Sequence, residues 1–146
     1  MGAFFSSFMR APAPPRAAHI TSSTLFDMAK EACTKAYCPY SNFPVGAVVE
    51  LSDGSTFVGV NVENKSYSLT SCAESGAIAT MVAHTTPENR VVRRVLIYGP
   101  HTVPIMPCGA CRQMMMEFAD AECEVVACND TDQQKYRLRD LLPEAF

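Results

Sequence analysis

The 146 residues fit a single domain of ordinary globular composition, with 48% apolar and 18% charged residues. This composition excludes a disordered chain, a collagen and a coiled coil, and no apolar run approaches the roughly 18 residues that a membrane span needs. A formal net charge of −3 disfavours a long nucleic acid as partner, because such binders usually carry excess positive charge. The seven cysteines cannot all pair in disulfides, which favours reduced thiols or metal ligands.

The N-terminal segment 1–23 differs from the rest of the chain. It holds two arginines, three prolines and no acidic residue, so the ten basic and fifteen acidic residues of 24–146 give that part a net charge of −5. We expect 1–23 to be a flexible tail and 24–146 to be one domain in the cytoplasm. Two targeting patterns stay open: Gly2 with Ser6 fits an N-terminal acylation motif, and the acid-free composition with Arg and Ser suits an organelle transit peptide.

The hydrophobic pattern of 24–146 predicts alternating helices and strands. The predicted elements, in chain order, are a helix over 25–33, a strand over 45–51, a turn at 52–54, a strand over 56–62, a helix over 73–83, a strand over 91–98, a helix over 109–119 and a strand over 124–128. The first two strands form a predicted hairpin, and the segment 138–142 is too short to assign. Two strand–helix–strand passages indicate an α/β domain with helices covering the sheet.

Three cysteines stand where predicted helices begin. Cys72 precedes the helix over 73–83, and Cys108 and Cys111 lie one helical turn apart at the start of the helix over 109–119. The free N–H groups and partial positive charge of a helix N-terminus favour the thiolate, which is the form that binds metals. Two helices pointing at one place would build a site of three sulfurs, which suits zinc and leaves a fourth position for water.

Glu74 follows Cys72 by two residues, on the same first helical turn. A carboxylate at this place can take a proton from zinc-bound water and pass it on without binding the metal itself. Taken alone, Glu74 would be interpreted as a residue that interacts with the helix dipole. The three cysteines beside it favour the acid–base role.

These motifs, together with three further segments, resemble the cytidine deaminase family over about residues 25–146. The segments that carry the resemblance are Cys72-Ala73-Glu74, Pro107-Cys108-Gly109-Ala110-Cys111-Arg112-Gln113, and residues 36–47, 59–64 and 141–146. The resemblance implies a three-layer α/β/α fold with a mixed central β-sheet. It also implies hydrolytic deamination of cytidine and 2′-deoxycytidine to uridine and 2′-deoxyuridine, with release of ammonia, in pyrimidine salvage.

The same resemblance implies the catalytic machinery. Cys72, Cys108 and Cys111 would hold one Zn²⁺ per subunit, zinc-bound hydroxide would attack C4 of the base, and Glu74 would shuttle the protons. The residue after Glu74 is commonly arginine in the family, where it hydrogen-bonds the ligand sulfurs, but this chain has Ser75. Three alternatives stay open for how the negative charge of the three thiolates is offset without that arginine. Helix dipoles and backbone N–H groups offset it, Arg112 turns inward to do so, or it is not offset and activity is lower, with an altered substrate.

Four substrate-binding residues follow from the resemblance. Phe43 corresponds to the aromatic residue that stacks on the base, and the Ala73 backbone N–H corresponds to a contact with that base. Asn61 and Glu63 correspond to the pair that hydrogen-bonds the ribose hydroxyls. A carboxylate near the sugar repels phosphate, so Glu63 favours a free nucleoside as substrate. Core packing for Phe43 and a turn role for Asn61 are the simpler alternatives.

Three more residues are implied by the family's assembly, a homotetramer with shared active sites. Lys65 and Tyr67 fall where the family approaches the 5′ end of a nucleoside in a neighbouring subunit. Phe146 resembles the aromatic residue that one subunit lends to another, although it could equally anchor the core. Lys65 stands where small residues are common, so it is either a solvated loop lysine or a charge suited to a 5′ phosphate.

Two other functions stay open. One is deamination of a different cytosine-bearing compound, such as blasticidin S or a nucleotide. The other is a non-catalytic structural zinc module, which would need a fourth ligand to close the site. The remaining cysteines and all histidines are interpreted as packing or surface residues without a ligand role; they are Cys33, Cys38, Cys123, Cys128, His19, His84 and His101.

Overall fold

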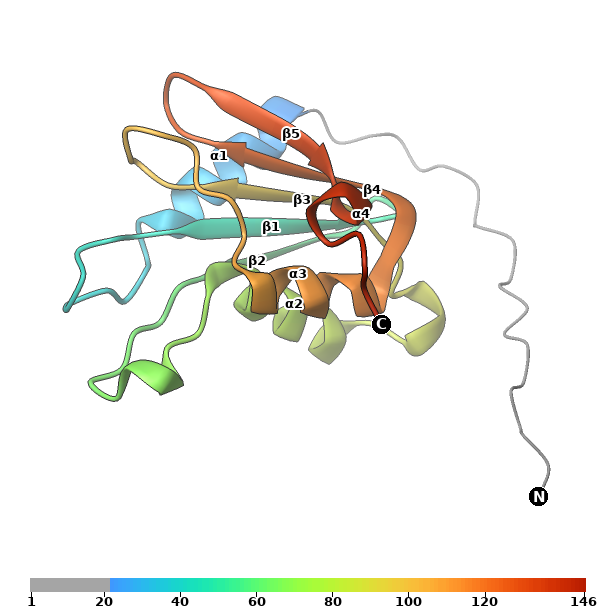
Figure 1. Cartoon of the computed structure of the whole chain (residues 1–146), viewed down its shortest axis with the longest axis horizontal. Helices are drawn as coiled ribbons and strands as arrows, with labels where there is room; N and C mark the ends of the chain where they lie inside the picture. Colours follow the sequence, from blue (N-terminus) through green and yellow to red (C-terminus); the bar gives the residue numbers. More distant parts are fainter. Residues whose placement is uncertain (1–21) are drawn as a thin grey trace.

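A computed structural model describes residues 22–146 as a five-stranded sheet with helices on both faces (Figure 1). The elements, in chain order, are α1 (Ser22–Cys33), β1 (Gly46–Leu51), β2 (Thr56–Val60), η1 (Tyr67–Leu69), α2 (Ala73–His84), η2 (Pro87–Asn89), β3 (Val92–Tyr98), α3 (Gly109–Phe118), β4 (Ala119–Cys128), β5 (Gln133–Arg137) and α4 (Leu138–Leu141). The predicted tail and its targeting motifs lie outside the described residues, apart from two serines with which α1 begins. No helix within 22–146 is long and apolar enough to cross a membrane.

The sheet has the strand order β2-β1-β3-β4-β5 and contains both kinds of pairing. β1 runs antiparallel to β2 and β3, β4 runs parallel to β3, and β5 runs antiparallel to β4. The hairpin between β1 and β2 turns at Gly54, whose φ of 88° lies in the left-handed region that glycine adopts without strain. The parallel pair is connected through α3, because a crossover of this kind needs a long connection. The predicted mixed sheet is confirmed.

The two faces of the sheet have separate cores, so the predicted three-layer arrangement is also confirmed. On one face, Val48 of β1 packs with Leu25 and Ala29 of α1. On the other face, neighbouring Val49 packs with residues of α2 and α3, among them Met115. Since consecutive strand residues point to opposite faces and both faces are covered, all six residues of β1 are buried.

Helix α2 lies close against the sheet at Gly59 of β2. A Cβ atom at this position would come within 2.1 Å of the Ala77 backbone nitrogen and 2.3 Å of the Ala73 carbonyl oxygen. Only glycine permits this approach, and it seats the first turns of α2 on the strand. The position of the helix N-terminus is therefore fixed by backbone packing.

Three elements differ from the prediction. The strand β5 has the polar sequence QQKYR and lies at the sheet edge, so it shows no apolar alternation that could have predicted it. The strand before it, β4, starts at Ala119, earlier than the predicted 124. The predicted strand 56–62 ends at Val60, beyond which Val62 forms isolated bridges with Tyr37 and Ser71.

Candidate metal and substrate site

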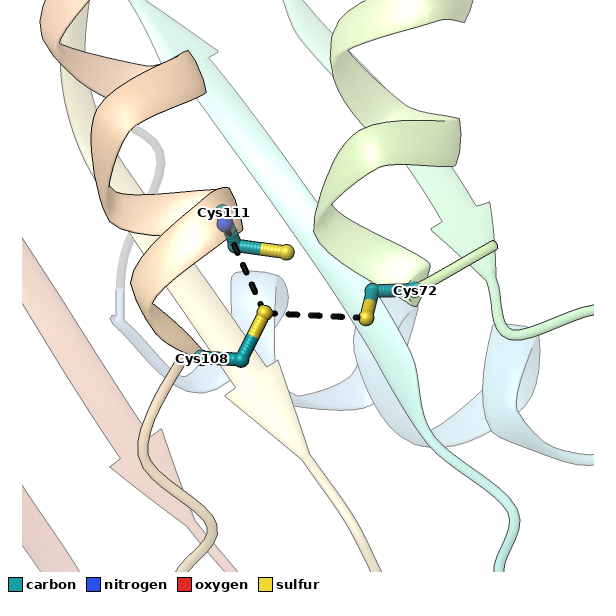
Figure 2. A group of neighbouring side chains, drawn as sticks. All are labelled: Cys72, Cys108 and Cys111. Atoms are coloured by element: carbon teal, nitrogen blue, oxygen red, sulfur yellow. Dashed lines mark hydrogen bonds between the residues drawn. The ribbon is translucent and has the colours of Figure 1, made fainter. Parts of the chain in front are cut away.

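The three cysteines predicted to bind metal lie together where α2 and α3 begin (Figure 2). Their sulfur atoms all lie within 4.8 Å of one another, and the Sγ atoms of Cys72 and Cys108 are 3.9 Å apart. These two residues are the N-cap residues of α2 and α3, so both helix N-termini point at the cluster. Within residues 22–146, no other group of three possible metal ligands is this close.

The cluster fits a zinc ion. Zinc binds thiolates at about 2.3 Å in tetrahedral geometry, which places two sulfurs about 3.8 Å apart, close to the 3.9 Å between Cys72 and Cys108. Cys111 is buried, whereas Cys108 is exposed, so the cluster is open on one side. Three sulfur ligands with an open side correspond to a catalytic site, in which the fourth position is left for water.

One thiol of the cluster, that of Cys72, favours the charged form. Hydrogen bonds from Cys111 and Cys108 lower the pKa of the Cys72 thiol to about 6, while the same contact with Cys72 raises the pKa of Cys111. The backbone N–H of Cys111 also donates to the Cys108 sulfur over 3.5 Å. The site thus favours the thiolate, which is the form that zinc binds, at Cys72.

Glu74 is buried on the first turn of α2, directly beside the cysteine cluster. Burial raises the pKa of its carboxyl group to about 6, and the neighbouring Cys72 thiolate adds to this increase. A carboxyl group with a pKa close to neutrality can both hold and release a proton. The position agrees with the acid–base role expected from the sequence.

The two residues expected around the ligands lie in different directions. The Ser75 hydroxyl is 3.6 Å from the Cys111 sulfur, so it provides a neutral hydrogen-bond partner there. Arg112 instead donates from Nε to the Pro107 carbonyl oxygen (2.8 Å) and from a terminal nitrogen to the Leu141 carbonyl oxygen (3.1 Å). Arg112 therefore holds the residue before Cys108, rather than turning inward to the sulfurs.

The segments expected to bind substrate leave the same end of the sheet. Gly46, the first residue of β1, pairs with Val60 at the end of β2 and with Tyr98 at the end of β3. Phe43 precedes this pairing, and the segment that carries Asn61 follows β2. The loop 99–107 leaves β3 and leads directly to Cys108. We call this end, where β1 starts and β2 and β3 stop, the site end of the sheet.

Asn61 is buried, and its side chain hydrogen-bonds the backbone of the segment before β1. Its side-chain nitrogen donates to the Phe43 carbonyl oxygen, and its side-chain oxygen accepts from the Val45 N–H, both over 2.8 Å. An asparagine amide has a second N–H and a second acceptor lone pair beyond the two groups that make these bonds. The turn role and the substrate role considered for this residue are thus compatible.

Glu63 holds the neighbouring loop. Its carboxylate accepts from the backbone N–H groups of Tyr40 (3.0 Å) and Ser41 (3.2 Å) and from the Ser41 hydroxyl. The Ser41 hydroxyl is the main reason that the pKa of Glu63 lies below its usual value. The carboxylate therefore stays negatively charged beside the loop that leads to Phe43.

The other predicted residues are placed as follows. Ala73 is buried at the start of α2, next to the cluster, whereas Lys65 and Tyr67 are exposed in the segment between β2 and α2. The Phe146 ring is fully exposed, although its carbonyl oxygen accepts from the Gln113 side chain over 3.1 Å. Within one chain, the structure thus gathers the cysteines, Glu74, Ser75 and Ala73, but leaves the rings of Tyr67 and Phe146 in solvent.

His101 is a residue at the site end whose contacts the sequence did not indicate. Its ring stacks on Phe43, with ring centroids 3.6 Å apart and planes 9° apart. No short-range pattern predicts a contact between residues so far apart in the chain. The predicted surface role is confirmed for His84, which is exposed, while His19 lies outside the described residues.

The four cysteines outside the cluster are free thiols. Three are buried as predicted (Cys33, Cys123 and Cys128), and Cys38 is half-buried. Burial raises the pKa of both Cys123 and Cys128 to about 12, which leaves these thiols protonated and unreactive.

Comparisons with known proteins agree with this geometry. The sequence model of the family described as "Cytidine and deoxycytidylate deaminase zinc-binding region" matches residues 20–127. A cytidine deaminase of Mycobacterium tuberculosis is 41% identical over 118 residues, which cover 81% of this chain and 84% of that protein. One of Halalkalibacterium halodurans is 42% identical over 112 residues, which cover 76% and 83%.

Solved structures show the same fold. The crystal structure of cytidine deaminase from Burkholderia pseudomallei has a TM-score of 0.79 and 43% identity, and it covers 87% of this chain and 100% of its own. That from Mycobacterium tuberculosis has a TM-score of 0.72 and 37% identity, with 87% and 98% covered. With the family match over most of the chain and a three-cysteine cluster that fits its zinc, this protein belongs to the cytidine and deoxycytidylate deaminase family of zinc enzymes.

Proposed function

We propose that this chain hydrolyses cytidine and 2′-deoxycytidine to uridine and 2′-deoxyuridine, releases ammonia, and serves pyrimidine salvage. The observation that carries the proposal is the cluster of three sulfurs within 4.8 Å, with buried Glu74 on the adjoining helical turn. The related proteins named cytidine deaminase support this substrate over blasticidin S. The open side of the cluster favours catalysis over a structural zinc module.

Cys72, Cys108 and Cys111 would hold the zinc ion through their thiolates. When bound, zinc supplies Lewis acidity, which makes a water molecule acidic enough to act as a nucleophile near neutral pH. Glu74 takes one proton from this water and delivers it to N3 of the base. The oxygen of that water would bond to C4, and Glu74 would take the remaining proton from this oxygen and pass it to the amino group, so that the C4–N bond breaks, the C4 carbonyl forms and ammonia leaves.

The substrate would be held by groups at the site end of the sheet. Phe43 offers its ring to the base and Ala73 its backbone N–H, while Asn61 and Glu63 bind the ribose hydroxyls. The charged Glu63 carboxylate repels a phosphate group, which favours a nucleoside over a nucleotide. Relative turnover of cytidine and cytidine monophosphate tests this preference and shows whether Lys65 accommodates the phosphate.

We propose a homotetramer in which active sites are shared between subunits. The supporting observation is that several large apolar side chains lie in solvent: Tyr67 is 77% exposed, Leu69 68% and Phe146 fully exposed. A second copy would cover these side chains, and Tyr67, Lys65 and Phe146 would then reach a neighbouring site. Light scattering on the purified protein measures the mass, and a monomeric active enzyme would contradict the proposal.

An ultraviolet assay with cytidine, combined with zinc analysis, tests the function directly. We expect one zinc per chain and loss of the cytidine absorbance as uridine forms. One zinc per chain without turnover of cytidine, deoxycytidine or blasticidin S would instead indicate the structural module. We also propose a cytoplasmic location, because free thiols suit a reducing compartment, and cell fractionation measures it.

A further inference from the structure

The ring of His101 covers one face of Phe43. The centroid distance of 3.6 Å and the interplanar angle of 9° mean that the two rings overlap almost completely. Phe43 is nevertheless 43% exposed. A phenyl ring has two faces, and His101 occupies one of them, so a ligand that stacks on Phe43 must use the opposite face.

His101 is itself held firmly in the loop between β3 and α3. Its Nε2 lies 3.1 Å from the Pro44 carbonyl oxygen, which can only accept, so this nitrogen carries a proton and donates it. The His101 carbonyl oxygen accepts from the side chain of the buried Asn129 over 2.9 Å. The His101 backbone N–H donates to the Gly99 carbonyl oxygen over 2.8 Å. The imidazole is therefore positioned by the fold before any ligand binds.

Gly99 makes room for this imidazole. A Cβ atom on Gly99 would lie 2.6 Å from His101 Cδ2 and 2.4 Å from Ile105 Cδ1, which are both below van der Waals contact. Because both distances are too short, an alanine at this position would force both the imidazole and the Ile105 side chain to move. The chain thus offers a way to displace His101 without removing it.

The segment that carries Phe43 is held from two sides. Asn61 bonds the backbone of Phe43 and Val45, and His101 bonds the carbonyl oxygen of the intervening Pro44. Asn61 fixes only the backbone, which leaves the Phe43 ring free to rotate about its side-chain bonds. The stack with His101 is a contact of the ring itself, and it favours one orientation of the ring plane.

We propose that His101 is a positioning residue for the pyrimidine base: it backs one face of Phe43, so that the opposite face is presented flat to the substrate. This inference rests on the proposed function, in which Phe43 stacks on the base. Without His101, the Phe43 ring samples several rotamers, and substrate binding must restrict them. Loss of His101 therefore weakens binding of the base, while the zinc site and Glu74 are unchanged.

The test compares His101→Ala with His84→Ala, which removes an exposed histidine from the end of α2. We expect His101→Ala to raise the KM for cytidine and the Kd for uridine, measured by calorimetry, by about 3- to 10-fold, the size of an aromatic pair contribution. Its kcat should stay within about twofold, its zinc content should stay at one per chain, and His84→Ala should match wild type. A Kd for uridine within about twofold of wild type in His101→Ala would overturn the proposal.

Two further variants separate stacking from hydrogen bonding. His101→Phe keeps a ring over Phe43 but cannot donate to Pro44, whereas His101→Gln keeps a donor but has no ring. We expect the phenylalanine variant to bind uridine more tightly than the glutamine variant, and the reverse order would overturn the stacking role. We also expect Gly99→Ala to weaken uridine binding as His101→Ala does. Unchanged uridine binding by Gly99→Ala would contradict the positioning role of His101.

The uridine measurements do not depend on turnover. If wild-type protein with one zinc per chain fails to deaminate cytidine, the proposed function fails. The Kd values of the variants for uridine then still decide whether His101 positions Phe43. Failure of the stack and failure of the function are therefore read from different measurements.

Discussion

The site has two halves that the fold holds in different ways. The metal half consists of Cys72, Cys108, Cys111, Glu74 and Ser75, and all of these stand on the first turns of α2 and α3. The substrate half consists of Phe43, Asn61, Glu63 and His101, which stand on segments that leave the strands and are tied together by side-chain contacts.

This difference determines which property a substitution in each half changes. In the metal half, helix geometry fixes the side chains, and the three cysteines and Glu74 each supply a chemical group that has no substitute. In the substrate half, each residue positions another, so a single change loosens the arrangement without destroying it. We therefore expect metal-half variants to change zinc content or kcat, and substrate-half variants to change stability or binding.

Removal of one ligand gives the largest expected effect. Cys111→Ser replaces the buried thiolate with a poor zinc ligand, so we expect loss of both bound zinc and cytidine turnover. Metal analysis of the purified protein and the ultraviolet assay check this. The control is Cys38→Ser, at a half-buried cysteine outside the cluster, which should keep one zinc per chain. Full zinc retention in Cys111→Ser would contradict the three-sulfur site.

Glu74→Gln comes next and separates the two tasks within the metal half. The amide fills the same space but cannot shuttle protons, so we expect zinc to remain and kcat to fall by about 10²- to 10⁴-fold. Steady-state kinetics with zinc analysis measures both quantities. The exposed Glu117→Gln on α3 is the matched control and should retain activity. Near-normal turnover in Glu74→Gln would show that another group moves the protons.

Ser75→Ala tests the contact that takes the place of an arginine at the ligands. Removal of the hydroxyl beside the Cys111 sulfur should reduce zinc affinity or lower kcat by about tenfold. This is the low end of the effect seen when a residue that hydrogen-bonds a metal ligand is removed. Competition with a chelator measures the affinity. Ser68→Ala, in the exposed segment between β2 and α2, serves as the control. Unchanged zinc affinity and kcat would show that the helix N-termini support the ligand sulfurs without the Ser75 hydroxyl.

Asn61→Ala gives the smallest effect on chemistry and the clearest effect on the fold of the substrate half. It removes both bonds to the segment before β1 and leaves the Val45 N–H without a side-chain acceptor. We expect a loss of about 1–3 kcal/mol in the free energy of unfolding, measured by urea denaturation, with zinc content unchanged. Asn89→Ala, at an exposed position, should cost little. Loss of zinc in Asn61→Ala would mean that the halves are not independent.

The sequence alone determined most of the metal half and the core of the fold. Cys108 and Cys111 lie one turn apart on a helix, and Glu74 shares a turn with Cys72, so short spacing already defines their geometry. The apolar strands and the hairpin turn at Gly54 were predicted for the same reason, since a local pattern sets them. Such features need no knowledge of distant residues.

Tertiary structure alone decided the rest. The polar strand β5 exists because its backbone pairs with β4, which no side-chain pattern reports. Arg112 could face the sulfurs or the C-terminal segment until the packing of α4 placed the Leu141 carbonyl oxygen within reach. His101 meets Phe43 only because β1 and β3 pair in a register that brings their loops to one end of the sheet. Contacts between distant loops depend on that register, which is a property of the whole sheet.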